Sequence, residues 1–297
     1  MLIFDLNFIL FNFLLNLLNN ITLIMTSKLI KTILTLLITF LSNNLDAQKF
    51  YGKAVYLQKS KMQLGSWGAR MSEAQKNQIK ARLKNRLEKT YILTFNKQAS
   101  KFVEDEKIDA ISGATDSWGG YFSRGDQYRN TKENQLVQSQ EFYGKRFLVK
   151  DNTYTINWEM GTETKQIGQY TVYNATATVP TNEVAWYNFS WGDLRQDKDP
   201  ETGELKVKTI TIEAWYTLQI PVSHGPGEFW GLPGLILEVK AGDTVMLCSE
   251  VVISTKENIE IVAPEKGEEI SKKEYAATIR NKMIEMRNNR MGRRRSR

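Results

Sequence analysis

The residues of this chain whose types could support chemistry are one histidine, one cysteine and a few glutamates in apolar surroundings. His224 follows Ser223. In a catalytic pair the nucleophile and its base must face each other, and residues adjacent in sequence rarely do so. A structural role for His224 is therefore the stronger interpretation. His224, Met246 and Cys248 are ligand types that suit copper. However, Met246 and Cys248 alternate along one apolar run, as core residues do. We therefore predict no metal and no cofactor.

Glu213 and Glu238 lie in apolar, strand-like surroundings, where burial could shift a carboxyl pKa towards acid–base work. Such residues more often lie on the solvated face of a strand. Neither a phosphate-binding loop nor zinc-ligand spacing is present in the sequence. We therefore predict no catalytic residue. An exported hydrolase that uses carboxylates or His224 is kept as the alternative function.

Aromatic side chains within glycine-rich segments are the best candidates for a binding surface. These residues are Trp118, Tyr121, Phe229 and Trp230. Aromatic rings supply large contact areas at interfaces, although packing in the core is the competing interpretation. They favour a non-catalytic protein that binds a hydrophobic ligand or a protein partner on the face of a sheet.

Phe229 and Trp230 belong to the densest turn signal in the chain, which leads into a short apolar strand. Its centre is the hexapeptide Gly231-Leu232-Pro233-Gly234-Leu235-Ile236. Pro233 cannot donate a ladder hydrogen bond, so the strand should begin after it. Gly234 permits a close backbone approach that a Cβ would hinder. We predict that this motif is architectural, with Leu235 and Leu237 in the core and Ile236 covered from the other side.

The hydrophobic pattern along the chain predicts an α+β fold. Strand-like runs cover residues 49–59, 90–97, 99–104, 135–149, 154–159, 166–179, 206–220, 235–239 and 244–253, whereas residues 108–127 suggest a long loop. Ser72 opens a helix that carries Ile79, Leu83 and Leu87, and Ser271 opens a last helix with Tyr275, Ile279 and Met283 facing inwards. The expected architecture is a curved, mainly antiparallel sheet with one long helix after the first strand and a C-terminal helix.

The hexapeptide at residues 231–236 reads GLPGLI, and several ordered motifs accompany it. These are AWYT at 214–217, IPVS at 220–223, GP at 225–226, LEV at 237–239, RFLVKD at 146–151, INW at 156–158 and TKQIG at 164–168. Over roughly residues 50–260 the chain resembles the GLPGLI family of exported proteins from Bacteroidetes-type bacteria. Val172 departs from the pattern, since the family often has cysteine there. The resemblance implies a half-barrel with a helix across it, similar by analogy to lipoprotein carriers, and no established activity.

The N-terminal 47 residues have the layout of a signal peptide. Lys28 and Lys31 form a positive segment, residues 32–41 an apolar one too short to span a bilayer, and residues 42–47 a polar one ending at Ala47. We expect export to the periplasm or cell envelope, with residues 1–24 lying upstream of the true start at Met25. A membrane anchor made of the two apolar runs, residues 9–18 and 29–41, is the alternative. Residues 48–265 then form the β-rich domain, and residues 266–297 a helix and basic tail.

The net charge of +7 resides in the last eighteen residues, which hold eight Lys or Arg and one acid. The final basic cluster is Arg293, Arg294, Arg295 and Arg297. This pattern suggests a third function, a surface protein that binds polyanions through its tail without nucleic-acid specificity. Cys248 is the only cysteine, so no intramolecular disulfide can form, and a core of this size must be stable without one.

Overall fold

The computed structural model describes residues 32, 50–61, 68–105, 124–187, 207–255 and 260–295, without the side chains of 85, 86 and 290–295. The chain divides into two compact units, residues 1–49 and 50–297. In the first unit only Thr32 is described, in a helical conformation, so the expected signal peptide otherwise lies outside the described residues. Among the helices of the described part, none combines the length and apolar character that crossing a membrane requires.

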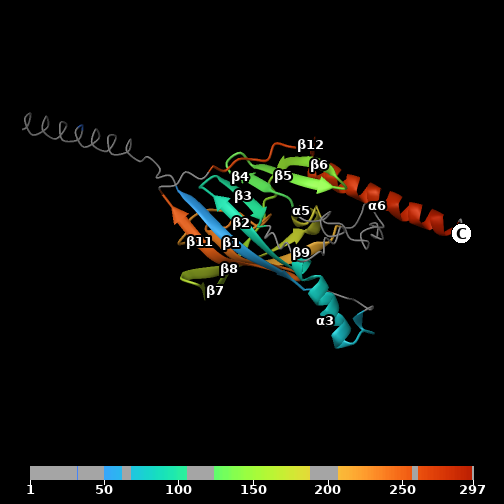
Figure 1. The fold of residues 1–297 in the computed structure, drawn as a ribbon. Coiled ribbons are helices and arrows are strands. Elements are labelled where there is room, and N and C mark those ends of the chain that lie inside the picture. Colours follow the sequence, from blue (N-terminus) through green and yellow to red (C-terminus); the bar gives the residue numbers. More distant parts are fainter. Residues whose placement is uncertain are drawn as a thin grey trace, which may run out of the picture. The chain divides into compact units, whose positions relative to one another are not determined.

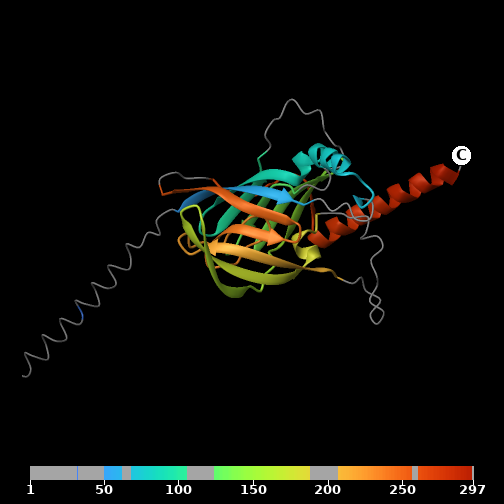
Figure 2. The same ribbon diagram turned by 90° about the horizontal axis from the view of Figure 1, so that it is seen from below.

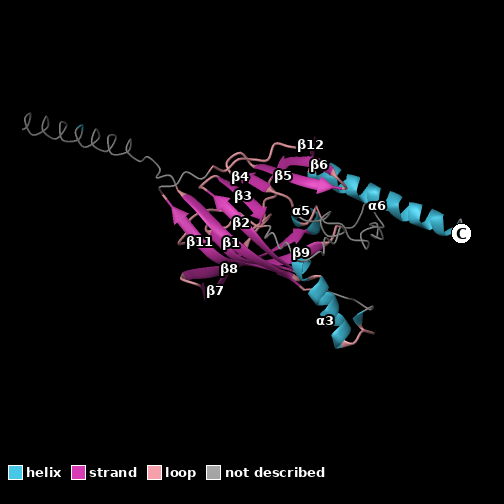
Figure 3. Ribbon diagram, viewed as in Figure 1, coloured by secondary structure: helices cyan, strands magenta, loops and turns pink. Residues whose placement is uncertain are grey.

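The second unit is mostly β and is organised around one open sheet of twelve strands (Figures 1 and 3). In chain order the strands are β1 (Tyr51–Ser60), β2 (Glu88–Phe95), β3 (Ala99–Glu104), β4 (Gln127–Asn130), β5 (Gln135–Phe142), β6 (Lys145–Asn152), β7 (Glu159–Ile167), β8 (Tyr170–Pro180), β9 (Thr209–Thr217), β10 (Leu235–Ala241), β11 (Thr244–Ser254) and β12 (Glu268–Ile270). Their order across the sheet is β12-β6-β5-β4-β3-β2-β1-β11-β10-β9-β8-β7.

The chain builds this sheet as two meanders that meet at β1. Strands β1 to β6 extend in one direction, and β7 to β11 start at the far edge and return until β11 pairs with β1. Neighbours are antiparallel throughout, except that β12 lies parallel to β6. The prediction of a mainly antiparallel sheet is therefore confirmed.

The helices differ from the prediction in length. A helix begins after Ser72 with the expected capping box, but α3 (Glu73–Arg82) has only ten residues and buries none of them. The backbone leaves helical geometry at Leu83, before the single turn α4 (Lys84–Leu87). The prediction of one long helix here is wrong, because the apolar positions have no facing core to pack against. Figure 1 shows α3 beyond the ends of the strands.

Several segments of the sequence fold as expected, and others do not. The predicted run 166–179 is the end of β7, a turn at residues 168–169, and β8. Residues 99–104 form β3, but the run 135–149 is two strands, joined at Tyr143 and Gly144, which both have positive φ. The segment 154–159 is extended without ladder pairing until β7 begins at Glu159. Strand β4 lies at the end of the predicted loop and was missed, because it is short and polar.

The core lies on one face of the sheet, termed here the inner face, which carries Tyr56, Leu93 and Ile212. The loop of residues 218–234 covers this face, and its Phe229 and Leu232 join the main core cluster. A second cluster forms where α6 (Lys272–Arg295) meets β6 and the segment after α5 (Thr181–Val184). As predicted, Tyr275, Ile279 and Met283 of α6 face inwards, none more than 2% exposed.

Candidate functional site

The glycine-rich loop is fixed by hydrogen bonds at both of its ends. The backbone amides of Gly231 and Ile236 donate to the carbonyls of Ser223 and His224, at 3.0 and 3.1 Å. Strand β10 then begins at Leu235, and Leu235, Ile236 and Leu237 are at most 1% exposed. The prediction that this hexapeptide leads into a strand buried on both faces is confirmed.

Two tryptophans join the loop to the segment that precedes β7. The indole N–H of Trp158 donates to the carbonyl of Trp230 at 2.9 Å, and the indole N–H of Trp230 donates to the carbonyl of Tyr154 at 2.8 Å. Trp230 is half-buried. Its indole therefore anchors the loop, which leaves only part of the ring for contact with other molecules.

Of the other aromatic residues proposed for a binding surface, Phe229 is 5% exposed and packs in the main core cluster. Its assignment to a binding surface is wrong, because the loop turns this side chain towards the sheet. Trp118 and Tyr121 lie outside the described residues.

His224 is fully buried and bonded to the backbone. Its Nε2 donates to the carbonyl of Asn96 at 2.9 Å. Burial, with a smaller contribution from the positive charge of Arg129, lowers the pKa of His224 to about 4. The imidazole is therefore neutral near pH 7, and this geometry gives His224 a structural role.

Beneath the loop lies a buried ionic cluster that sequence reasoning missed, formed by Arg124, Arg129 and Glu228. Arg124 Nη1 and Glu228 Oε2 form an ion pair at 2.5 Å, with side chains 4% and 7% exposed. Arg129 Nη2 donates to the carbonyl of Gly227 at 2.5 Å. Gln127 Nε2 donates to Glu228 Oε1 at 3.0 Å. The cluster thus binds the loop to β4 and to the residues just before it.

The two arginines of this cluster differ in their electrostatics. Burial lowers the pKa of a guanidinium and is the largest single effect on Arg124, but the charge and hydrogen bond of Glu228, together with Tyr187 and Tyr91, outweigh burial and raise the pKa of Arg124. Burial lowers the pKa of Arg129 to about 10, and the positive charge of Arg124 contributes, while Glu228 opposes the shift. The negative charge of Glu228 therefore mainly neutralises Arg124. The positive charge of Arg129 is left without a balancing negative charge within the cluster.

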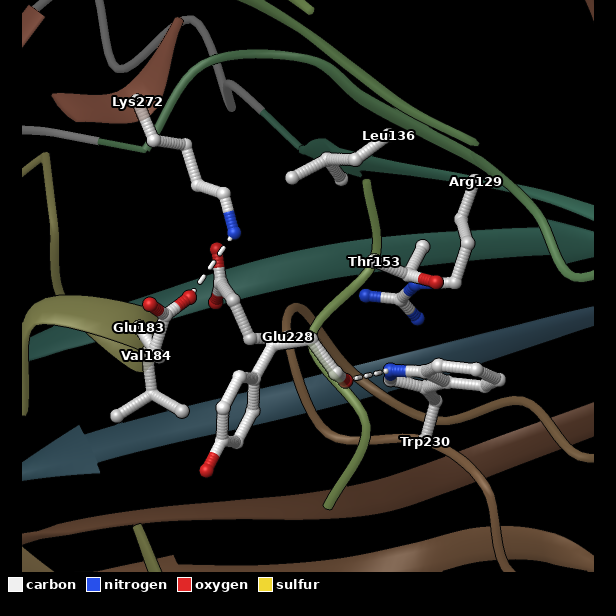
Figure 4. Close-up of a pocket in the computed structure, with 9 residues that line it drawn as sticks. Arg129, Leu136, Thr153, Glu183, Val184, Glu228, Trp230 and Lys272 are labelled. Carbon is white, nitrogen blue, oxygen red and sulfur yellow. Dashed lines mark hydrogen bonds and ion pairs between the residues drawn. The ribbon is translucent and has the colours of Figure 1, made fainter. Parts of the chain in front are cut away.

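A small pocket adjoins this cluster (Figure 4). Its lining residues come from β4, β5, the segment after β6, α5, the loop and the start of α6: Arg129, Leu136, Thr153, Tyr154, Glu183, Val184, Glu228, Trp230 and Lys272. Its volume is about 10 Å³, enough for roughly one water molecule. At one end Lys272 Nζ and Glu183 Oε2 form an ion pair at 3.1 Å.

The opposite, outer face of the sheet carries an apolar patch, termed here the outer strip. It consists of Val55, Leu57, Ile92, Val103, Leu247 and Val252. Leu57 lies opposite Leu247 across the β1–β11 pair, and Ile92 lies opposite both Val55 and Val103. Leu57, Leu247 and Val252 are 41%, 39% and 50% exposed, so the strip is accessible to a partner.

The two glutamates singled out from the sequence also point outwards, beside Trp215. Glu213 Oε1 accepts from the Trp215 indole at 2.9 Å. Glu238 Oε2 pairs with Lys165 Nζ at 2.5 Å, and that ammonium lies 4.1 Å from the centre of the Trp215 ring. Both carboxylates thus have partners on the solvated face of the sheet. This agrees with the interpretation that they are ordinary outward-facing strand residues and not catalytic groups.

Fold and site together define a mostly β protein with an open sheet and a loop held by a buried ionic cluster. Residues 158–238 match the model of an uncharacterised family, described as "Protein of unknown function (Porph_ging)". The hexapeptide at 231–236 lies within this match.

The chain also has a weak similarity to solved structures. Two are titled "Structure of PNGF-II in C2 space group" and "Structure of PNGF-II in P21 space group", each 15% identical, with TM-scores of 0.44 and 0.43. The alignments cover 77% and 75% of this chain and 32% of each solved chain, so the chain spans about a third of their length. No curated protein matches.

Proposed function

We propose that this protein is an exported member of the GLPGLI family that binds a protein partner in the periplasm or cell envelope without catalysis. The order of positive, apolar and polar segments before Ala47 supports export. The hexapeptide and its flanking motifs support the family assignment. The curved sheet then corresponds to the half-barrel of a lipoprotein-carrier-like fold.

The observation that carries the proposal is the outer strip. Leu57 and Leu247 lie side by side on adjacent strands, and both are about two-fifths exposed. Contiguous exposed apolar patches often mark interaction sites. Small-molecule sites are concave, whereas this patch lies on a sheet face, which suits the surface of another protein. The pocket formed by described residues beside Arg129 holds only about 10 Å³, which is too little for a hydrophobic ligand.

Site-specific photo-crosslinking in the native host tests this function. A photoreactive residue at Leu57 should give one defined adduct with an envelope protein, and the added substitution Leu247→Glu should abolish it. The matched control is Leu218, which is 49% exposed but lies outside the strip and should give no such adduct. Equal adducts at both positions, or an adduct that survives Leu247→Glu, would contradict the proposal.

A second candidate function rests on α6. Its buried residues Tyr275, Ile279 and Met283 lie in its first half, whereas the basic residues concentrate towards its end. Figure 2 shows the C-terminal half of the helix extending beyond the strands. The backbone is helical through Arg293, Arg294 and Arg295, and Arg297 lies outside the described residues. A basic helix of this kind suits an anionic surface.

The hydrolase alternative has less support. His224 is neutral, buried and bonded to Asn96. Glu213 and Glu238 are bound to Trp215 and Lys165 on the outer face. Geometry therefore favours binding over hydrolysis as the function.

A further inference from the structure

The buried ionic cluster holds more positive than negative charge. Arg124, Arg129 and Glu228 are each at most 7% exposed, and this group contains two guanidinium ions and one carboxylate. The pair of Lys272 and Glu183 at the end of the pocket is neutral as a unit. Among the described residues that line the pocket or join the cluster, the sum is therefore one positive charge. Burying an unbalanced charge is costly unless a counter-charge accompanies it.

Arg129 is the residue that carries the surplus. Its Nη2 donates to the carbonyl of Gly227, and its guanidinium carbon lies 5.6 Å from the centre of the Trp230 ring. Its Nε is buried and has no hydrogen-bond partner within the described part of the chain. Glu228, the carboxylate whose charge acts on Arg129, is already paired with Arg124 at 2.5 Å. Arg129 therefore offers both charge and an unused donor at the wall of the pocket (Figure 4).

We propose that this pocket binds one monatomic anion against the guanidinium of Arg129. This anion is chloride wherever chloride is the most abundant halide around the protein. The size of the pocket favours a small ligand, because its volume of about 10 Å³ suits a particle close to the size of water better than sulfate, phosphate or a carboxylic acid. The ammonium of Lys272 lines the same pocket, and both carboxylates there are already paired with cations. The anion neutralises the cluster that holds the loop, so its binding stabilises the fold.

The lowered pKa of Arg129 agrees with this assignment, since burial and repulsion from Arg124 both disfavour its charged form. A bound anion would oppose both effects. Ligands that bind the folded state alone raise the melting temperature, and above Kd the stabilisation grows with the logarithm of the ligand concentration.

Thermal unfolding of the protein purified from its host tests the site. Sodium chloride or bromide is titrated against sodium gluconate at constant ionic strength. Halide should raise Tm by about 2–4 °C when its concentration is several-fold above Kd, and Tm should then keep rising with the logarithm of the halide concentration. Arg129→Gln should remove this halide-specific rise in Tm, whereas Lys145→Ala, which removes an exposed lysine, should keep it. Equal Tm in halide and gluconate would overturn the proposal.

A second measurement remains decisive if Arg129→Gln does not fold. Crystals of the unmutated protein in bromide should show an anomalous peak in the pocket beside Arg129. A water at that position, with bromide only at surface lysines, would refute the anion site while leaving the proposed partner surface unaffected.

Discussion

Gly234 lies directly against the carbonyl group of Thr217. The approach is so close that a Cβ atom on residue 234 would lie 2.0 Å from that oxygen. The contact joins the residue before β10 to the last residue of β9. It involves backbone on both sides, so no side-chain rotation can relieve it. Gly234 does not have positive φ, so backbone conformation does not require glycine here. Crowding by the carbonyl of Thr217 does.

Replacing Gly234 by valine should therefore lower the free energy of unfolding by about 1–3 kcal/mol, because β9 and β10 must separate to admit the side chain. Urea denaturation measures the change. Lys240→Val is the matched control, since it introduces the same side chain at an exposed position of β10 and should change stability by less than about 0.5 kcal/mol. Equal midpoints for the two variants would show that the contact does not constrain the fold.

Leu237→Ala should cost roughly 2–5 kcal/mol, because the side chain is 1% exposed and its loss leaves a cavity in the main core cluster. Leu218→Ala, at a residue 49% exposed, should cost less than about 0.5 kcal/mol. Chemical denaturation of both variants provides the comparison. A wild-type midpoint for Leu237→Ala would show that the start of β10, which the hexapeptide leads into, is not part of the structural core.

Export predicts a defined N-terminus for the protein in its host. Cleavage should occur between Ala47 and Gln48, since the polar segment ends there in a small residue. Intact-mass measurement of the native protein reads this directly. A species that retains residues 25–47 would contradict cleavage and favour the membrane anchor.

Local signals explain what the sequence could predict. Strand β10 follows a proline and glycine pair, and the inward face of α6 repeats every four residues at Tyr275, Ile279 and Met283, so nearby residues suffice to specify both. Helix α3 was misjudged in length because its apolar spacing says nothing about whether a facing surface exists.

The candidate site could not be predicted in the same way. Gln127 and Glu228 are bonded although they lie 101 positions apart, and no local pattern near either residue signals the pairing. Arg124 and Arg129 resemble ordinary surface arginines in the sequence. Phe229 was misplaced for a similar reason, since the direction in which a loop turns depends on the core that it covers.

Removing residues 287–297 should leave the fold intact. Among the described side chains of α6, the buried ones are Tyr275, Ile279 and Met283, and all three precede the cut. The truncated protein should bind anionic vesicles more weakly than the full chain, since the deleted segment carries most of the excess charge. Vesicle co-sedimentation measures binding, and the difference should shrink at physiological salt, where the Debye length is about 8 Å. Equal binding of both proteins at low salt would exclude a role for the tail.

The last prediction concerns the neutral form of His224. Burial lowers its pKa from 6.5 to about 4 in the folded protein, so the unfolded chain binds an extra proton between these values. The free energy of unfolding therefore rises with pH across this window. The contribution of neutral His224 is fully present above pH 6.5 and is lost as the pH falls towards 4. The loss should reach roughly 2–3 kcal/mol at pH 4.5, because each unit of pKa difference corresponds to about 1.4 kcal/mol.

His224→Gln separates this contribution from that of the carboxylates, which titrate in both proteins. The glutamine amide can still donate to the carbonyl of Asn96, but it cannot bind a proton. Urea denaturation at pH 7 and pH 4.5 should therefore show a smaller loss for the variant than for the unmutated protein. If both lose the same free energy, the imidazole of His224 is not held neutral by the core, and its role beneath the loop must be reconsidered.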